Sequence, residues 1–379
     1  MNWQYYNPVI IHFGENSLNK LPAIVKEKKV LLVTTSGFTK RGITDRIIKI
    51  LGRNRIFVFD RVSPNPSMIN INNAASEISK FSSGSIAALG GGSVIDTAKV
   101  LSILLSYPTK DISLRSILEG KNNLPDSSKL SIIAIPTTAG TGSEVTPFAT
   151  IWDKTEKRKY SLTTPKIYPH TAILDPLLTL SLPRKETITS GLDALAHAFE
   201  AIWNRNATPI TDIYATRALE NIFISFPRMI KDMKNINYRA HMMKASLFAG
   251  LAISQTKTAL SHSISYPLTA YLGMPHGLAC SFTLPALLYF NTEEDEEYFL
   301  KIAKLLGSAS VKKLQEELIR LYMYIGVDKL FNNYVTSLSD LLELAPQMIS
   351  LKRAKNNIRE AELEDIKNIV KESWKMIFC

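Results

Sequence analysis

The sequence of 379 residues contains only two cysteines, Cys280 and Cys379. Two thiols cannot form a disulfide framework, and so few cysteines are typical of proteins that work in a reducing compartment. No apolar run reaches the roughly 18 residues that a membrane-spanning helix needs, and the N-terminus lacks the basic start and apolar core of a secretory signal. We therefore expect a cytoplasmic protein that is not associated with a membrane.

Extended basic patches are also lacking, although the net charge is +11. Basic residues occur in short stretches, at 26–29, 154–159 and 352–355, and aromatic residues are not interleaved with them. A nucleic-acid-binding surface usually presents a continuous basic patch, so we expect no nucleic-acid partner. The excess charge leaves two explanations open, a generally basic composition or attraction of an anionic substrate.

The pattern of apolar residues divides the chain into two parts. Residues 1–180 alternate between short apolar runs and helical patterns, which predicts an α/β domain with a Rossmann-like parallel sheet and helices on both faces. Residues 181–379 show apolar spacings of three and four, which predict an all-helical C-terminal domain. The predicted strands are Val30–Thr34, Arg55–Phe59, Ile86–Leu89, Ile132–Pro136 and Ala172–Asp175, and two predicted helices are Thr44–Leu51 and Met68–Lys80.

Two loops follow predicted strands of the first part. Gly90 to Ser93 precedes a helical pattern, and glycines there let the backbone and the first helical amides approach a phosphate. Pro136 to Thr146 is dense in hydroxyl groups and small side chains, which suits a ribose or a pyrophosphate. Ligands bind at the carboxyl ends of parallel strands, so the pair of loops favours a dinucleotide site. Each loop alone is equally compatible with an ordinary turn.

Four side chains of the second part form a candidate metal site. Asp193 and His197 are four residues apart and therefore lie on one face of a helix, which Ser190 is expected to cap. His262 lies near another helical stretch, and His276 lies in a Pro-His-Gly turn. One carboxylate and three imidazoles suit Fe(II) or Zn(II), and we expect no cysteine near them, which argues against a thiolate-based zinc site. The alternative is that each histidine is a hydrogen-bonded structural residue.

Together these motifs resemble the iron-dependent (group III) alcohol dehydrogenases, which have a dehydroquinate synthase-like fold. The resemblance extends over nearly the whole chain. It is carried by Tyr6-Asn7-Pro8, Phe13-Gly14, Pro64-Asn65-Pro66, Gly90-Gly91-Gly92-Ser93 with Asp96 and Lys99, Pro136 to Glu144, Asp175-Pro176, Gly191 to Leu195 with His197 and Glu200, and Pro275-His276-Gly277.

The resemblance implies a metal-dependent, NAD(P)H-linked alcohol dehydrogenase or aldehyde reductase. Its metal ligands would be Asp193, His197, His262 and His276, usually around Fe(II), with Zn(II) also possible. The residues that it assigns to the cofactor site, together with others of the same motifs, are Gly91, Gly92, Ser93, Asp96, Thr137, Thr138, Thr141, Ser143 and Lys159. The metal would polarise the carbonyl while hydride comes from the nicotinamide. A homodimer is expected from the family.

Two positions depart from the family's usual pattern. Many relatives carry a second histidine four residues after the third ligand, where this sequence has Tyr266. A tyrosine hydroxyl could relay a proton, although its reference pKa of about 10 makes it a poorer shuttle near neutral pH. Relatives that prefer NAD often have an acidic residue after the first strand, where this sequence has Thr35. With Lys40 and Arg41 nearby, Thr35 favours acceptance of NADPH, and NADH is the alternative.

Segments 262–268, 276–280 and 353–357 resemble the phosphonoacetaldehyde reductase branch of the family, which implies reduction of phosphonoacetaldehyde to 2-hydroxyethylphosphonate. Such an anionic substrate needs a cation, for which Arg158, Lys257 and Arg353 are candidates. The alternatives are another short aldehyde, of the lactaldehyde, sulfoacetaldehyde or butanal type. Two other classes are a dehydroquinate synthase-like lyase, which would lack this ligand spacing, and a non-catalytic binding protein, against which the complete ligand set argues.

Overall fold

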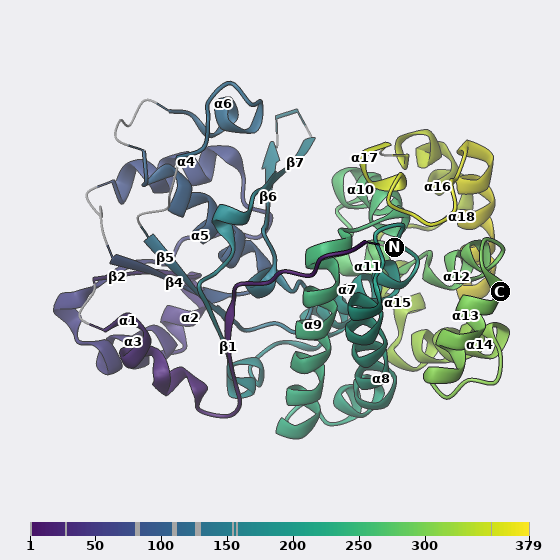
Figure 1. Ribbon diagram of the computed structural model, residues 1–379, viewed down its shortest axis with the longest axis horizontal. Helices are drawn as coiled ribbons and strands as arrows, with labels where there is room; N and C mark the ends of the chain where they lie inside the picture. The colour runs from purple at the N-terminus through teal and green to yellow at the C-terminus, as the bar shows by residue number, and fades with distance from the viewer. Residues whose placement is uncertain are drawn as a thin grey trace. The chain divides into compact units, whose positions relative to one another are not determined.

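The computed structural model describes residues 2–26, 29–79, 84–107, 112–125, 130–153, 155–156, 158–349 and 351–378. The chain forms two compact units, which Figure 1 colours along the sequence. An α/β unit comprises Asn7–Thr138 and Ser143–Ser181. A helical unit comprises Met1–Tyr6, Ala139–Gly142 and Leu182–Cys379.

A six-stranded sheet with the order β1-β8-β5-β4-β2-β3 is the centre of the α/β unit, and its neighbouring strands are parallel. Its strands are β1 (Ile10–Phe13), β2 (Val30–Val33), β3 (Ile56–Phe59), β4 (Gly84–Gly90), β5 (Leu130–Pro136) and β8 (Thr171–Leu174). The predicted parallel α/β fold is therefore confirmed. An antiparallel hairpin of β6 (Phe148–Asp153) and β7 (Arg158–Thr163) lies outside this sheet.

Helices cover both faces of the sheet, because a parallel sheet is stable only when both faces are buried. In β2, Leu31 and Val33 belong to one apolar cluster, and Val30 and Leu32 belong to another. The first cluster includes residues of α4 (Met68–Glu77), α5 (Gly92–Leu104) and α6 (Leu114–Leu118). The second includes residues of α1 (Leu21–Val25), α2 (Ser36–Lys40) and α3 (Ile43–Leu51).

The five predicted strands are all present, with ends that differ by a few residues. The predicted helix Met68–Lys80 ends at Glu77, and Lys80 itself lies outside the described residues. Neither β1 nor the β6–β7 hairpin was predicted. Both residues at the start of β1 are exposed, and the strand lies at an edge of the sheet, so its sequence lacks the continuous apolar pattern of a buried parallel strand.

The helical unit confirms the predicted all-helical C-terminal region, and one large apolar cluster runs through it. Its helices are α7 (Arg184–Ile202), α8 (Pro209–Lys231), α9 (Ile236–Thr256), α10 (Leu260–Leu272), α11 (His276–Ser281), α12 (Leu284–Thr292), α13 (Glu296–Leu305), α14 (Val311–Ile325), α15 (Val327–Phe331), α16 (Leu338–Leu344), α17 (Leu351–Ala354) and α18 (Leu363–Phe378). Within the described ranges, no helix is both long enough and apolar enough to cross a bilayer.

The prediction that Ser190 caps the first long helix is wrong. Helix α7 starts at Arg184 with Pro183 in the N-cap position, and Ser190 lies inside the helix with its hydroxyl donating to the Thr187 carbonyl. Proline is tolerated at a helix start, where amide groups have no intrahelical partner, so the chain can enter the helix about two turns earlier than predicted.

We predict that Ile71→Ala lowers the free energy of unfolding by about 2–5 kcal/mol, because it empties a packed site between α4 and the sheet. Ile71 is 1% exposed. Ile69 on the same helix is 63% exposed, and Ile69→Ala should change stability by no more than about 0.5 kcal/mol. Urea denaturation followed by circular dichroism measures both, and equal effects would contradict the described packing of α4.

Candidate active site

Three helices of the helical unit bring the four predicted ligands together. Asp193 and His197 lie one turn apart on α7, His262 lies on α10, and His276 is the first residue of α11. The Nε2 atoms of His197 and His262 lie 3.9 and 4.0 Å from Asp193 Oδ1. The rings of His197 and His262 stack at 4.9 Å between centroids, and the His276 ring meets His262 edge-on at 5.2 Å.

Two atoms of this cluster are buried with no hydrogen-bond partner among the described residues. They are Asp193 Oδ1 and His262 Nε2. Asp193 is 5% exposed and His262 is 3% exposed. Leaving a buried polar atom unpaired is costly, and the cost is greatest for a charged carboxylate. A cation among these atoms would remove that cost, so the donor set fits a divalent metal ion.

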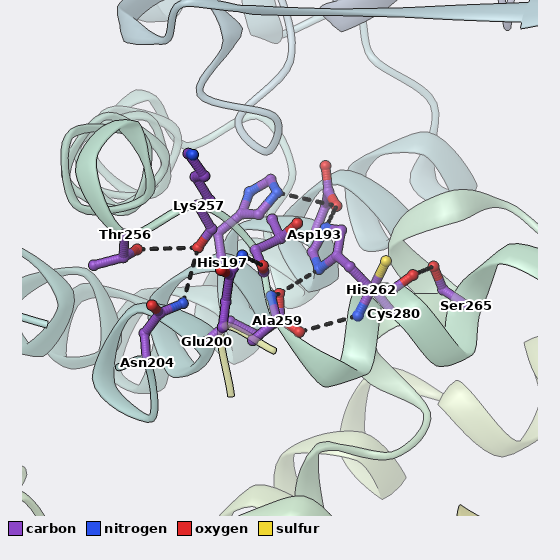
Figure 2. A network of polar contacts seen from close by, with 12 residues as sticks. Asp193, His197, Glu200, Asn204, Thr256, Lys257, Ala259, His262, Ser265 and Cys280 are labelled. Atoms are coloured by element: carbon purple, nitrogen blue, oxygen red, sulfur yellow. Dashed lines mark hydrogen bonds and ion pairs between the residues drawn. The ribbon is translucent and has the colours of Figure 1, made fainter. Parts of the chain in front are cut away.

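Polar contacts on the far side of two rings fix their orientation, as Figure 2 shows for the His262 side. His197 Nδ1 donates to the Gly140 carbonyl at 3.2 Å, and His262 Nδ1 lies 2.7 Å from Glu200 Oε2. Such contacts leave the lone pair of Nε2 free to bind a metal, and metal-binding histidines usually have a partner of this kind at their other ring nitrogen. Burial lowers the pKa of His197, which favours the neutral ring that a metal requires.

Glu200 is completely buried on α7. It accepts hydrogen bonds from the amides of Ala259 and His262 at 2.9 and 3.0 Å. Burial alone would raise its pKa, but the His262 ring and these amides lower the pKa to about 2. Glu200 is therefore a fixed negative charge behind the His262 ring.

The expectation that no cysteine lies near the histidines is wrong. Cys280 is fully buried, and its Sγ lies 3.5 and 3.6 Å from the two ring nitrogens of His276. One ligand atom from each of Asp193, His262, His276 and Cys280 lies within 4.8 Å of every other. The signal in the sequence was the spacing of four between His276 and Cys280, which places both on one side of a helical turn.

Close approach of α11 to α7 requires the glycine that follows His276. A Cβ atom at Gly277 would lie 1.9 Å from the Thr189 carbonyl oxygen and 2.9 Å from Asp193 Cβ. Neither contact can relax easily, because one is with the backbone of α7 and the other is with a Cβ atom fixed to that backbone. Only glycine therefore lets His276 sit beside the Asp193 turn of α7.

In the α/β unit the two predicted cofactor loops begin side by side at the ends of β4 and β5. Gly90 is in register with Pro136, and the Thr137 amide donates to the Gly90 carbonyl at 3.1 Å. A Cβ atom at Gly91 would lie 3.2 Å from the Thr138 side chain. Helix α5 then starts at Gly92, with Ser93 in its first turn.

Several other predicted cofactor residues bond to one another. Ser143 Oγ donates to Asp96 Oδ1 at 2.6 Å, and the Thr150 amide donates to Asp96 Oδ2 at 2.8 Å. Lys99, fully buried, donates to Ser143 Oγ at 2.9 Å and to the Phe148 carbonyl at 2.7 Å. These hydrogen bonds connect α5 to the second loop and to the β6–β7 hairpin, so they hold the backbone of the second loop in position.

The other residues predicted to contact the cofactor lie outside this hydrogen-bond network. Thr35 is half-buried in the N-cap position of α2, two residues after the end of β2, whereas Lys40 and Arg41 are exposed. Lys159 is half-buried on β7, with its ammonium group 5.8 Å from the Trp152 ring centroid. Thr141 is half-buried in the short segment that groups with the helical unit.

Of the three candidate cations for an anionic substrate, Arg158 and Lys257 are exposed. Arg353 is half-buried, and its guanidinium carbon lies 4.5 Å from the centroid of the Tyr266 ring. Tyr266 itself lies one helical turn after His262 on α10. Burial lowers the pKa of Arg353 to about 10, with the negative charge of Glu200 opposing the shift. Among the described residues no carboxylate forms an ion pair with Arg353.

We predict that Glu144→Gln becomes more stable relative to the wild type as the pH rises from about 5 to about 8. Glu144 is 2% exposed, and burial raises its pKa to about 7. The folded state therefore holds a proton that the unfolded state releases at lower pH, so wild-type stability falls through this range while glutamine does not titrate. The difference should grow by up to about 3 kcal/mol.

Chemical denaturation at several pH values measures this difference, with Glu15→Gln, at an exposed glutamate of the same unit, as the matched control. A difference between Glu144→Gln and the wild type that is constant with pH, or that shrinks as the pH rises, would contradict the buried, protonated glutamate.

Comparison with known proteins identifies the family. Residues 8–176 match the model of the iron-containing alcohol dehydrogenases, and residues 187–374 match that of the C-terminal region of the Fe-containing alcohol dehydrogenase family. Together the two matches include nearly all of both units.

Individual relatives agree. The chain is 33% identical over 310 residues to a choline dehydrogenase of Bacillus subtilis (strain 168), covering 81% of this chain and 75% of the relative. It is 33% identical over 316 residues to an NADPH-dependent butanol dehydrogenase of Clostridium saccharobutylicum, covering 82% and 79%. The fold is similar to that of a sulfoacetaldehyde reductase from Bifidobacterium kashiwanohense in complex with NAD+, with a TM-score of 0.90, 30% identity and 98% of each chain covered.

Both units match the two halves of one family, and relatives of at least 30% identity match most of the chain. The chain therefore belongs to the iron-containing alcohol dehydrogenase family and is an NAD(P)-dependent oxidoreductase that interconverts alcohols and aldehydes.

Proposed function

We propose that this protein reduces a short aldehyde that carries an anionic group. Phosphonoacetaldehyde, reduced to 2-hydroxyethylphosphonate, is the first candidate substrate. Sulfoacetaldehyde is the second, and the similarity to a sulfoacetaldehyde reductase supports it. Both substrates join a reactive carbonyl to a tetrahedral oxyanion through one methylene group, so one cation could recognise either.

Arg353 is the observation that carries this proposal. A guanidinium that is partly removed from water, and that has no carboxylate partner among the residues the structure describes, is unfavourable unless a ligand supplies the negative charge. Stacking on the Tyr266 ring orients the planar group, and arginine can bind phosphonate or sulfonate oxygens through two parallel hydrogen bonds. A neutral aldehyde such as butanal would gain nothing from this residue.

In this proposal Asp193, His197, His262 and His276 hold the metal, which supplies a Lewis acid for the aldehyde carbonyl. Glu200 keeps the His262 ring in the tautomer that presents Nε2, and the Gly140 carbonyl does the same for His197. Tyr266, four residues after His262 on α10, is the candidate that would relay the proton to the product oxygen.

The cofactor residues of the proposal lie in the α/β unit except for Thr141, and the hydride comes from NADPH or NADH. The backbone at Gly91, Gly92 and Ser93 would receive the pyrophosphate, since it opens α5. Thr137, Thr138, Thr141 and Lys159 would contact the nucleotide. Asp96 and Ser143 would contribute by holding the second loop in position through their hydrogen bond. Thr35 cannot repel a 2′-phosphate and therefore favours NADPH.

The remaining parts of the proposal come from the resemblance. Residues 1–180 would form the dinucleotide-binding domain, and residues 181–379 would form the metal-binding and substrate domain. The protein would act as a homodimer in the cytoplasm, in phosphonate metabolism if phosphonoacetaldehyde is its substrate.

The proposal is tested by anaerobic turnover of the Fe(II)-loaded protein with phosphonoacetaldehyde, sulfoacetaldehyde, lactaldehyde and butanal. We expect Arg353→Gln to lower kcat/KM for the two oxyanion aldehydes by about 10- to 100-fold, the value of a hydrogen bond to a charged group. The rate with butanal should stay within about twofold of the wild type.

Arg359→Gln is the matched control, because Arg359 also stacks on an aromatic ring but pairs with Glu293. It should leave the preference among the four aldehydes unchanged. Equal, weak rates of the wild type on all four aldehydes, or the same loss for butanal as for the oxyanion aldehydes in Arg353→Gln, would refute recognition of an anionic group.

We also expect Gly277→Ala to lower metal affinity by at least about tenfold, because the added methyl group would push His276 away from Asp193. Competition with a chromophoric chelator measures the affinity. Gly37→Ala is the control, since a Cβ atom at Gly37 would meet the flexible end of Arg41 at 3.2 Å and the Thr35 hydroxyl at 3.6 Å, which is an ordinary contact. Unchanged affinity in Gly277→Ala would argue against His276 as a ligand.

A further inference from the structure

Cys280 is the one donor of the candidate metal cluster that the proposed ligand set does not use. It lies one helical turn after His276 on α11 and is fully buried. Its Sγ atom belongs to the group of mutually close ligand atoms from Asp193, His262 and His276. Cys280 also belongs to the large apolar cluster of the helical unit, so its burial alone does not indicate coordination.

The distances suit two ligands of the same ion. With metal–sulfur and metal–nitrogen bonds of about 2.3 and 2.1 Å, neighbouring ligands of one ion at angles of about 90–109° separate sulfur from nitrogen by about 3.1–3.6 Å. Cys280 Sγ lies 3.5 and 3.6 Å from the two ring nitrogens of His276. A hydrogen bond from the thiol to the ring would have a similar length, so this distance alone does not decide between them.

A second observation favours coordination. One ligand atom from each of Asp193, His262, His276 and Cys280 lies within 4.8 Å of every other. Asp193 Oδ1 and His262 Nε2, both in residues at least nine-tenths buried, have no hydrogen-bond partner among the described residues. An ion that satisfies these two atoms would therefore lie within reach of Cys280 Sγ, a placement that a hydrogen bond from the thiol to His276 does not require. An ion bound at all four groups satisfies them together.

We propose that Cys280 is a fifth ligand of the same metal ion, bound as a thiolate beside Asp193, His197, His262 and His276. The thiol loses its proton to solvent, the sulfur forms a bond to the metal, and no electron is transferred. A thiolate is softer than a carboxylate or an imidazole, so it raises the preference of the centre for Zn(II) and Co(II) relative to Fe(II). This inference rests on the metal centre proposed above.

Cobalt substitution tests the sulfur bond without any assay of activity. The metal-free protein, titrated anaerobically with Co(II), should show the near-ultraviolet charge-transfer absorption of a thiolate–cobalt bond together with the visible bands of bound Co(II). Cys280→Ser and Cys280→Ala should lose the charge-transfer absorption but keep visible bands. Zn(II) affinity should fall by at least about tenfold in both variants, and Fe(II) affinity should fall less.

Cys379→Ser is the matched control, because Cys379 is the chain's other cysteine, and this variant should keep the charge-transfer absorption. Visible cobalt bands without charge-transfer absorption in the wild type would overturn ligation by Cys280 and leave the proposed metal centre standing. Cobalt binding that is unchanged in His262→Ala would instead overturn the metal centre, and the role of Cys280 with it.

Discussion

A buried carboxylate holds together the segment from which the candidate metal centre is built. Between α9 and α10 the backbone leaves the helical path, with Lys257 at a positive φ of 65°, and the first amides of α10 have no intrahelical partner. Glu200 accepts hydrogen bonds from two of these amides and meets the His262 ring with the same carboxylate. One side chain therefore starts the helix and also aims its histidine. Without it, two buried amides and a ring nitrogen would all lose their acceptor.

The α/β unit solves a similar problem with the opposite charge. Lys99 is fully buried and has its pKa lowered to about 8 by burial, yet its ammonium group donates to Ser143, Thr146 and Phe148. These acceptors lie on the loop and hairpin that follow β5. A charged hydrogen bond to backbone carbonyls is strong in a dry interior, so the lysine fixes a segment that has little regular structure of its own. In both units, a buried ion gives irregular backbone a defined position.

The sequence predicts features that depend on local patterns and fails on those that depend on tertiary approach. Strands such as Val30–Val33 were evident because both faces of a parallel strand are buried, which produces a continuous apolar run. The spacing of Asp193 and His197 was likewise a local pattern. The β6–β7 hairpin was missed because β7 is mostly polar and contains a single buried residue, Leu162. The place of Cys280 was missed because it depends on how closely α11 packs against α7, which only the contacts of Gly277 reveal.

The charges around the candidate centre limit how it could select an anion. Asp193 and Glu200 contribute two negative charges and Arg353 one positive charge, so a divalent ion with neutral imidazoles brings the sum to about +1. A Cys280 thiolate would bring the sum to about zero before any substrate binds. Net charge could then no longer attract a phosphonate or a sulfonate. Selection would have to come from the position of Arg353, whose planar group is oriented by the Tyr266 ring, rather than from the overall field. Ligation by Cys280 and recognition by Arg353 are therefore compatible only if the anionic group contacts the guanidinium directly.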